Sequence, residues 1–315
     1  MLQKIDLTTL PVAPTLHWSE AFGLHLRNTP SQKNRKRAHL SLSAYLSDVR
    51  LVAGWFEGQY GVEFVPSHLN QVNLGEYFAE LERTGKPATY NRRLASVRML
   101  IAWAQSLDLL DDDPAAWIPF MDAVRNSPRD VSQEERLKLE AEAEAGEDTL
   151  IGLRDSVIFF LMSDLGLRIN EVVTLKMSDL HLEDGYIHVL GKGNKHREPK
   201  AGTRLINKIC TWLDRKPSSF EGTLITDERG SAIERGQAWR RFILVAERAG
   251  VKTTPHSMRH TYVMRLLESY MKGNPARFGA AIKAVCQQTG DKPEVILAYY
   301  TNPRESDIRA AVEAM

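Results

Sequence analysis

Residues 166–195, GLRINEVVTLKMSDLHLEDGYIHVLGKGNK, contain the change of periodicity that decides the fold. The first ten residues predict a short helix entered through a glycine, and Tyr186–Leu190 predicts a β-strand. GKGNK then supplies the glycine and asparagine residues of a tight hairpin turn. Leu180–Leu182 is the expected strand partner on the other side. We therefore predict a small antiparallel β-sheet inside a largely helical domain.

Helical periodicity dominates the sequence on both sides of this stretch. Apolar residues recur at helical spacing from Leu42 to Phe56 and from Tyr90 to Ala104, and a further helix is predicted over residues 71–83. Leu153–Leu165 reads as an apolar helix that stops at Gly166. The predicted fold class is mostly α with a small antiparallel β-sheet.

A polar, proline-containing segment, DAVRNSPRDVSQ, separates two periodic regions. Ser132 with Glu135 three residues later is a capping-box signature for the helix that follows. The predicted organisation is an N-terminal arm or extension at residues 1–30, a helical domain at 31–121, a linker at 122–133 and a mixed domain with a C-terminal tail at 134–315.

Composition narrows the class of protein. The 315 residues suit two domains, and 26% charged residues are typical of a globular protein. Two cysteines, Cys210 and Cys286, exclude a disulfide scaffold and a cysteine-rich zinc module. The sequence predicts neither a membrane span nor a secretory signal, so we expect a cytoplasmic protein. Residues 151–315 carry 25 basic and 19 acidic residues, which favours a polyanionic partner.

Four separate clusters in the second half contain candidate catalytic residues. They are GLRINEVVTL with Arg168 and Glu171, GKGNKHREP with Lys192, PHSMRHTY with His256 and Arg259, and GDKPEVILAYYT with Asp291 and Tyr300. Each alone has an ordinary structural explanation, such as an ion pair, an exposed turn or a packed aromatic ring. Together and in this order they resemble the tyrosine recombinases, or phage integrase family. That family has an arginine in a G-L-R-x-x-E box, a hairpin lysine, H-x-x-R, a G-H or G-W box, and a tyrosine about nine residues later.

The resemblance implies a recombinase that clamps duplex DNA between two domains. Residues 31–121 would be the helical core-binding domain, and residues 134–315 the mixed α/β catalytic domain. The implied reaction is site-specific cleavage and rejoining of DNA through a covalent 3′-phosphotyrosyl intermediate, for integration, excision or resolution in a mobile element or chromosome. Because that linkage conserves the bond energy, no metal, ATP or other cofactor is expected.

The matching residues suit the roles that this chemistry needs. Arg168 and Arg259 can hold the charge that builds up on the phosphate oxygens, with donors that stay protonated. The phenol of Tyr300 is the expected nucleophile. His256 suits proton transfer or phosphate orientation near neutral pH. Lys192, on its hairpin, can protonate the departing 5′-oxygen.

Two departures from the family pattern stand out. Asp291 lies where the family usually has His or Trp, and an ionised carboxylate cannot donate a hydrogen bond to a phosphate. It could instead orient His256 or a neighbouring arginine, or the local register could be shifted. Arg259 and Asp291 are also 32 positions apart, roughly ten more than the family suggests. We place the surplus in a Gly/Pro-containing loop around residues 269–279.

Several local alternatives accompany the assignment. Lys195 competes with Lys192, but the family places its lysine directly after the glycine of the strand. Tyr299 competes with Tyr300, but nine positions separate Asp291 from Tyr300, which is the usual interval. The His256–His260 spacing resembles a zinc motif, but the glutamate that this motif needs is replaced by serine.

The expected binding partners are inferred from the family resemblance and from the positions of basic side chains. DNA contacts are expected from two groups, Arg92, Arg93 and Arg98 on a helix and Lys36 and Arg37 in KNRKR, although both could be solvated basic faces. The family implies a double-stranded recombination site and a tetramer on two sites, with a C-terminal tail that docks on a neighbouring protomer. The sequence names neither the target site nor any accessory protein.

Three rival functions remain to be separated. A type IB topoisomerase uses the same chemistry without pairing two sites. A DNA-binding protein of the same fold could have lost its activity, with Asp291 as the trace of that loss. A metal-dependent transposase would need an acidic constellation, and the sequence contains no evident one.

Overall fold

The computed structural model describes residues 16–29, 39–122, 130–191, 195–218, 222–301 and 313. The chain divides into two compact units, Met1–Arg125 and Asn126–Met315. Residues 123–129, most of the expected linker, lie outside the described residues, as do the expected contacts Lys36 and Arg37.

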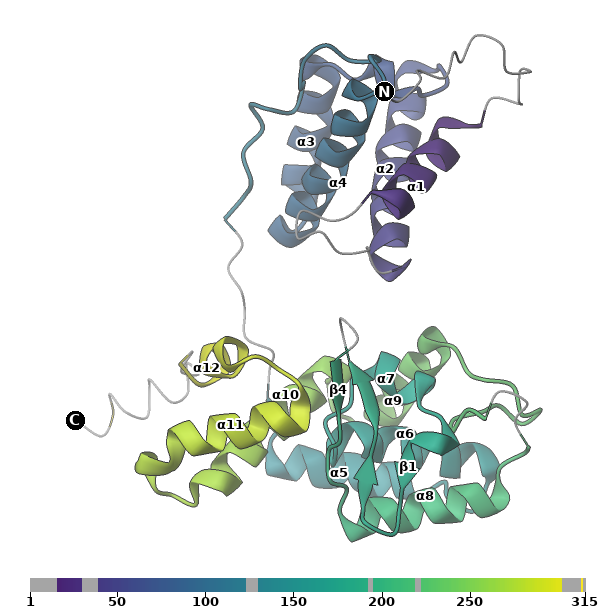
Figure 1. The fold of residues 1–315 in the computed structure, drawn as a ribbon, viewed down its shortest axis with the longest axis vertical. Helices are drawn as coiled ribbons and strands as arrows, with labels where there is room; N and C mark the ends of the chain where they lie inside the picture. Colours follow the sequence, from purple (N-terminus) through teal and green to yellow (C-terminus); the bar gives the residue numbers. More distant parts are fainter. Residues whose placement is uncertain are drawn as a thin grey trace, which may run out of the picture. The chain divides into compact units, whose positions relative to one another are not determined.

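The first unit is helical (Figure 1). Its elements are α1 (Trp18–Asn28), α2 (His39–Tyr60), a 3₁₀ turn (Pro66–His68), α3 (Gln71–Thr84) and α4 (Pro87–Gln105). The helix predicted over residues 71–83 is confirmed, and Asn70 caps it by accepting hydrogen bonds from two backbone N–H groups. Leu94, Val97 and Ile101 are buried, so the stripe predicted for α4 faces the core.

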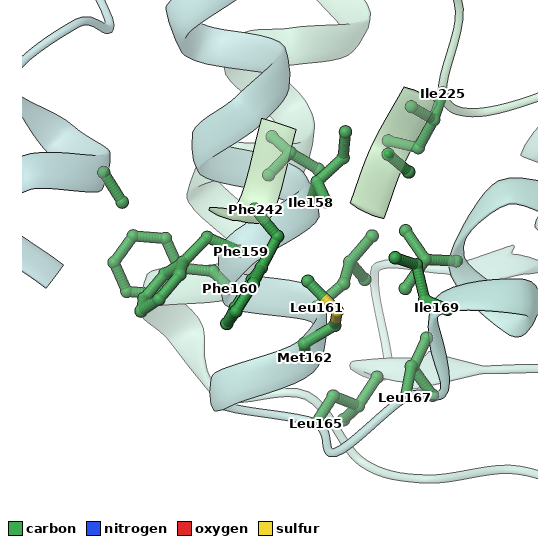
Figure 2. Close-up of a cluster of buried hydrophobic side chains, with 14 of the residues drawn as sticks. Ile158, Phe159, Phe160, Leu161, Met162, Leu165, Leu167, Ile169, Ile225 and Phe242 are labelled. Atoms are coloured by element: carbon green, nitrogen blue, oxygen red, sulfur yellow. The ribbon is translucent and has the colours of Figure 1, made fainter. Parts of the chain in front are cut away.

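The second unit packs helices around a central apolar helix. Its helices before the last segment are α5 (Gln133–Glu144), α6 (Leu150–Ser163), α7 (Ile169–Thr174), α8 (Thr203–Arg215) and α9 (Arg235–Arg248). α6 is buried on almost every side, and its Phe159 ring stacks on Phe242 of α9 (Figure 2). The predicted capping box of Ser132 and Glu135 opens α5. This packing fixes the C-terminal end of α6, directly before the turn that leads to Arg168.

The predicted strand at residues 186–190 is divided in the structure. β1 (Leu180–His181) pairs with β2 (Tyr186–Ile187), and β3 (Val189–Gly191) pairs with β4 (Lys195–Arg197), both antiparallel. The division falls at His188, whose backbone N–H donates to the carbonyl of Asp179 at 2.8 Å. That hydrogen bond continues the register of the β1–β2 pairing, and an isolated bridge between Tyr186 and Lys200 continues the register of the β3–β4 pairing. The predicted strand therefore has the expected partner, Leu180–His181, on one side and the segment from Lys195 to Lys200 on the other.

Three helices close the described part of the chain (Figure 1). They are α10 (Pro255–Met271), α11 (Phe278–Thr289) and α12 (Pro293–Thr301), with a 3₁₀ turn at Pro275–Arg277. The loop expected at residues 269–279 is shorter than predicted. α10 continues to Met271, Lys272 ends it with a left-handed backbone (φ 49°), and α11 begins at Phe278. The mostly α fold with small antiparallel sheets is confirmed.

Two absences hold for the described residues. None of their helices is long and apolar enough to cross a membrane. No group of three or more His, Cys, Asp or Glu side chains among them could hold a metal ion.

Candidate active site

Arg168 lies at the entrance to α7, directly after the turn that ends α6. Gly166 makes this turn with φ 63°, and a Cβ there would lie 2.2 Å from a ring carbon of Tyr262. The backbone N–H of Arg168 donates to Glu171 Oε2 at 2.9 Å, and its Nη1 donates to Oε1 at 3.0 Å. The Arg168 side chain is 38% exposed. The turn and Glu171 therefore hold the Arg168 side chain in place and leave part of it exposed to solvent.

Arg259 reaches the same place from the second turn of α10. Its side chain is only 6% exposed. Nη1 donates to the Gly166 carbonyl, and Nη2 donates to the Thr289 carbonyl at 2.7 Å and to Asp291 Oδ2 at 2.6 Å. Burial lowers the pKa of Arg259, and the charge of Asp291 opposes that shift. Backbone and side-chain acceptors together hold this buried charge in one orientation.

Asp291 joins the two arginines. Gly290 ends α11 in a left-handed conformation (φ 69°), and Asp291 follows it, before α12. Its Oδ1 accepts from Arg168 Nη2 at 2.6 Å, and its Oδ2 accepts from Arg259 Nη2 at 2.6 Å. Of the roles that the sequence left open, the geometry matches contact with neighbouring arginines.

Arg197 is a further member of this cluster, and sequence reasoning missed it. Its Nη1 and Nη2 donate to the two oxygens of Glu171 at 2.9 and 2.7 Å, a bidentate pair. Its Nε donates to the Gln288 carbonyl at 3.2 Å. A usable signal was present, because Arg197 follows Lys195 at the two-residue period of a strand and so shares its face.

The charges form a chain of alternating sign, Arg197–Glu171–Arg168–Asp291–Arg259. Burial raises the pKa of the Glu171 carboxyl, but hydrogen bonds and charge from Arg197, with help from Arg168, outweigh burial and the net pKa shift is downward. Glu171 therefore stays ionised at neutral pH. The three guanidiniums and two carboxylates leave one net positive charge in the cluster.

A cleft opens beside this chain. It is lined by Arg168, Gly191, His196, Arg197, Cys286, Gln287, Gly290 and Asp291. Because the lining includes Gly191, the cleft reaches the end of β3, where the predicted Lys192 follows. Lys192 itself lies outside the described residues, as do residues 193 and 194.

His256 lies in the first turn of α10, three residues before Arg259, and is exposed. Although the residue as a whole is exposed, partial burial of its ring lowers its pKa, interactions with His260 and Arg259 lower it further, and Asp291 raises it; the net pKa shift is downward from 6.5. His256 is therefore mostly neutral at pH 7, when one ring nitrogen can accept a proton and the other can donate one.

The two candidate tyrosines belong to α12. The buried Ile296 packs this helix into a small cluster with Val263 of α10 and Val285 of α11. The side chains of Tyr299 and Tyr300 lie outside the described part of the structure. Their assignment stays a prediction from the nine-residue spacing.

The three arginines predicted to contact DNA on α4 all have partners within the first unit. Arg92 Nη1 donates to Asp48 Oδ2 at 2.6 Å, and Arg93 Nη1 donates to the Tyr77 hydroxyl at 2.8 Å. Arg98 donates to backbone carbonyls at 2.8 and 3.2 Å. Of the two arginines that form ion pairs with Asp48, Arg92 has the more exposed side chain, at 47% against 20% for Arg93. Arg92 therefore has the better access to a phosphate.

The phage integrase family matches residues 130–275, and the phage integrase N-terminal SAM-like domain matches residues 32–106. Tyrosine recombinase XerC of Xanthomonas campestris pv. campestris (strain B100) is 30% identical over 266 residues, which cover 83% of this chain and 80% of the relative. The chain belongs to the phage integrase family of tyrosine recombinases. It is therefore an enzyme, a site-specific recombinase.

Other tyrosine recombinases agree with this assignment. Tyrosine recombinase XerD of Vibrio cholerae serotype O1 is 28% identical over 279 residues, which cover 85% of this chain and 87% of the relative. Among solved structures, XerH bound to difH substrate in a pre-cleavage complex has a TM-score of 0.66 at 17% identity, covering 94% of both chains. A lambda integrase(75–356) dimer bound to a COC′ core site has a TM-score of 0.64 at 16% identity, covering 91% of this chain and 95% of that one. The family fold thus extends over both units.

Proposed function

We propose that this recombinase cleaves and rejoins DNA through a covalent 3′-phosphotyrosyl bond to Tyr300. One observation supports it above all. The guanidiniums of Arg168, at the entrance to α7, and of Arg259, in α10, converge on the carboxylate of Asp291, and each donates to it at 2.6 Å. A pair of fixed, permanently charged donors is what a phosphodiester transition state requires.

The remaining residues can be assigned steps in the reaction. The Tyr300 oxygen attacks phosphorus and loses its proton, while the bond from phosphorus to the 5′-oxygen breaks. Lys192 gives a proton to the departing 5′-oxygen. Neutral His256 can accept the tyrosine proton or orient the phosphate. Rejoining reverses these steps, and because the phosphotyrosyl bond retains the energy of the broken bond, neither ATP nor a metal takes part.

The proposed substrate is a double-stranded recombination site, and the reaction would take place in the cytoplasm. A lambda integrase tetramer bound to a Holliday junction is among the solved structures of similar fold, with a TM-score of 0.61 at 17% identity. We extend that assembly to this chain: four protomers on two sites. Arg92, Arg93 and Arg98 would support the clamp on DNA, and the site would serve a mobile element or a chromosome.

Covalent trapping on a nicked suicide substrate tests the proposal. DNA from sequences flanking the gene is incubated with wild type, Tyr300→Phe and Tyr299→Phe, without metal or ATP. We expect an SDS-resistant protein–DNA band in wild type and Tyr299→Phe, and its loss in Tyr300→Phe. A band that survives in Tyr300→Phe would show that another residue is the nucleophile.

A DNA-binding protein without activity is the second candidate. The observation that favours it is Asp291, which already occupies the two arginines that the phosphate needs. This candidate predicts shifted DNA in a gel and no covalent band in any variant, on any flanking sequence that the protein binds tightly.

A further inference from the structure

We propose that Asp291 is an internal substitute for the DNA phosphate, and that binding of a phosphate displaces its carboxylate from the arginine pair. The inference rests on the proposed function, because it gives the anion site of that reaction an occupant. Asp291 would keep Arg168 and Arg259 oriented in the free enzyme. It would also lower the affinity of the site for any other anion.

The hydrogen-bond partners of Arg259 indicate which of them a phosphate could replace. A guanidinium has five N–H donors, two of them on Nη2. Both Nη2 donors are engaged, one by the Thr289 carbonyl at 2.7 Å and one by Asp291 Oδ2 at 2.6 Å. Nη1 donates to the Gly166 carbonyl. The backbone carbonyls are fixed by the turns that carry them, so the side chain of Asp291 is the partner that can leave.

The charge of the cluster leads to the same result. Its three guanidiniums and two carboxylates carry one net positive charge. A phosphodiester added beside a resident carboxylate would meet like-charge repulsion at contact distance. Once Asp291 leaves, the three guanidiniums and the remaining carboxylate of Glu171 carry two net positive charges instead of one.

The position of Asp291 allows it to move. It follows Gly290, whose left-handed backbone ends α11, and one residue, Lys292, separates it from α12. Its carboxylate lies at the wall of the cleft and not inside a packed helix. Glu171 differs, because the bidentate pair with Arg197 and the backbone N–H of Arg168 hold it in α7. Of the two carboxylates, Asp291 is the one we assign to exchange.

Inorganic phosphate is a direct probe, since it carries the chemistry of the ligand without DNA. Thermal stability is measured against phosphate concentration for wild type, Asp291→Asn and the matched control Asp155→Asn. Asp155 is also a buried carboxylate that accepts from two arginines, Arg154 and Arg241, outside the cleft. At constant ionic strength, we expect the half-saturating phosphate concentration to fall at least about tenfold in Asp291→Asn and to stay unchanged in Asp155→Asn.

A double variant locates the new binding. Asp291→Asn combined with Arg168→Gln should return the phosphate response to that of wild type, because one of the two donors is lost. Equal phosphate responses in Asp291→Asn and Asp155→Asn would overturn the proposal. So would a stronger response in Asp291→Asn that survives the loss of Arg168.

Wild type offers a second measurement if Asp291→Asn does not fold. In ¹⁵N-labelled protein, saturating phosphate should shift the backbone amide of Asp291, whose N–H donates to Thr289 Oγ1 at 3.3 Å. An amide of Asp291 that does not move while Arg168 responds would mean that phosphate adds beside the carboxylate, which would refute displacement.

These readouts are separate from covalent trapping. If no variant traps DNA but Asp291→Asn binds phosphate more tightly than wild type, the proposed function is refuted and the displacement of Asp291 by phosphate is supported. If wild type traps DNA but phosphate binding does not depend on Asp291, the proposed function is supported and the displacement of Asp291 is refuted.

Discussion

Two buried aspartates in the second unit form the same contacts in different surroundings. Asp155 Oδ1 accepts from Arg154 Nη2 at 3.0 Å, and its Oδ2 accepts from Arg241 Nε at 2.6 Å. Asp291 likewise bridges two arginines, one with each oxygen. The side chains of both aspartates are less than a tenth exposed. The contacts of the carboxylates therefore do not distinguish a structural bridge from a candidate active site.

The supporting elements do distinguish them. Asp155 and Arg154 are neighbours within α6, so their bridge to Arg241 only fastens α6 to α9. Asp291 lies between two helices, and its arginines come from two other segments. Burial of an ion pair is weak support for function. Placement on a short connection beside a cleft, with one arginine partly open to solvent, is stronger support.

The largest expected difference concerns catalysis. Arg259→Ala removes the buried donor to Asp291, and we expect the rate of covalent trapping to fall by roughly 10³-fold, since one donor to a developing oxyanion contributes about 10²–10³. Arg241→Ala removes the corresponding partner of Asp155 and should change that rate less than about threefold. Single-turnover trapping on the suicide substrate measures both.

Circular dichroism of each variant is the control for folding. Similar losses of trapping in folded Arg259→Ala and folded Arg241→Ala would erase the distinction between the two bridges.

Stability should change in the opposite order. Asp155→Asn leaves Arg154 buried without its carboxylate, and we expect the free energy of unfolding to drop by about 3 kcal/mol. Asp291→Asn should cost about half of that or less, because Arg168 retains Glu171 and Arg259 retains two carbonyl acceptors. Urea denaturation followed by tryptophan fluorescence compares them, and a larger loss in Asp291→Asn would contradict the assignment of Asp155 as the structural bridge.

The smallest effect is on His256. Its pKa is already lowered by burial and by neighbouring positive charges, whereas Asp291 raises it. Asp291→Asn should therefore lower the pKa of His256 further, and Asp155→Asn should leave it unchanged. NMR titration of the His256 ring proton gives the midpoints.

The same shift has a consequence for stability. Because the pKa of folded His256 lies below the 6.5 of the unfolded chain, the unfolded chain binds more protons as pH falls through that range. The contribution of His256 to stability should thus decrease from pH 6.5 downward, and His256→Gln should reduce this dependence. A stability that instead increases as pH falls, and does so less in His256→Gln, would show a raised pKa.

Local patterns predicted much of this molecule because they depend on near neighbours. The stripe on α4 and the capping box at Ser132 follow from helical spacing alone. The bridge between Tyr186 and Lys200 was not predictable in this way, because Lys200 lies beyond the end of β4. A strand pattern reports which residues alternate, and it does not report which partner each residue meets.

The candidate site shows the same limit. Motif order was enough to select Arg168 and Arg259, which the fold brings to one carboxylate. Arg197 was missed because its partner, Glu171, lies 26 positions away on another element. The role of Asp291 stayed open because a carboxylate takes its function from the charges around it, and tertiary structure alone supplies them.

The alternating chain of charges also has a consequence for synthesis of the protein. Its members come from α7, β4, α10 and the connection after α11, and the proposed nucleophile follows them all. A ribosome delivers these segments in that order. If Tyr300 is the nucleophile, as proposed, an unfinished chain has the arginines of the cluster but not the group that attacks DNA. The proposed capacity to cut DNA would then arise only when translation is nearly complete.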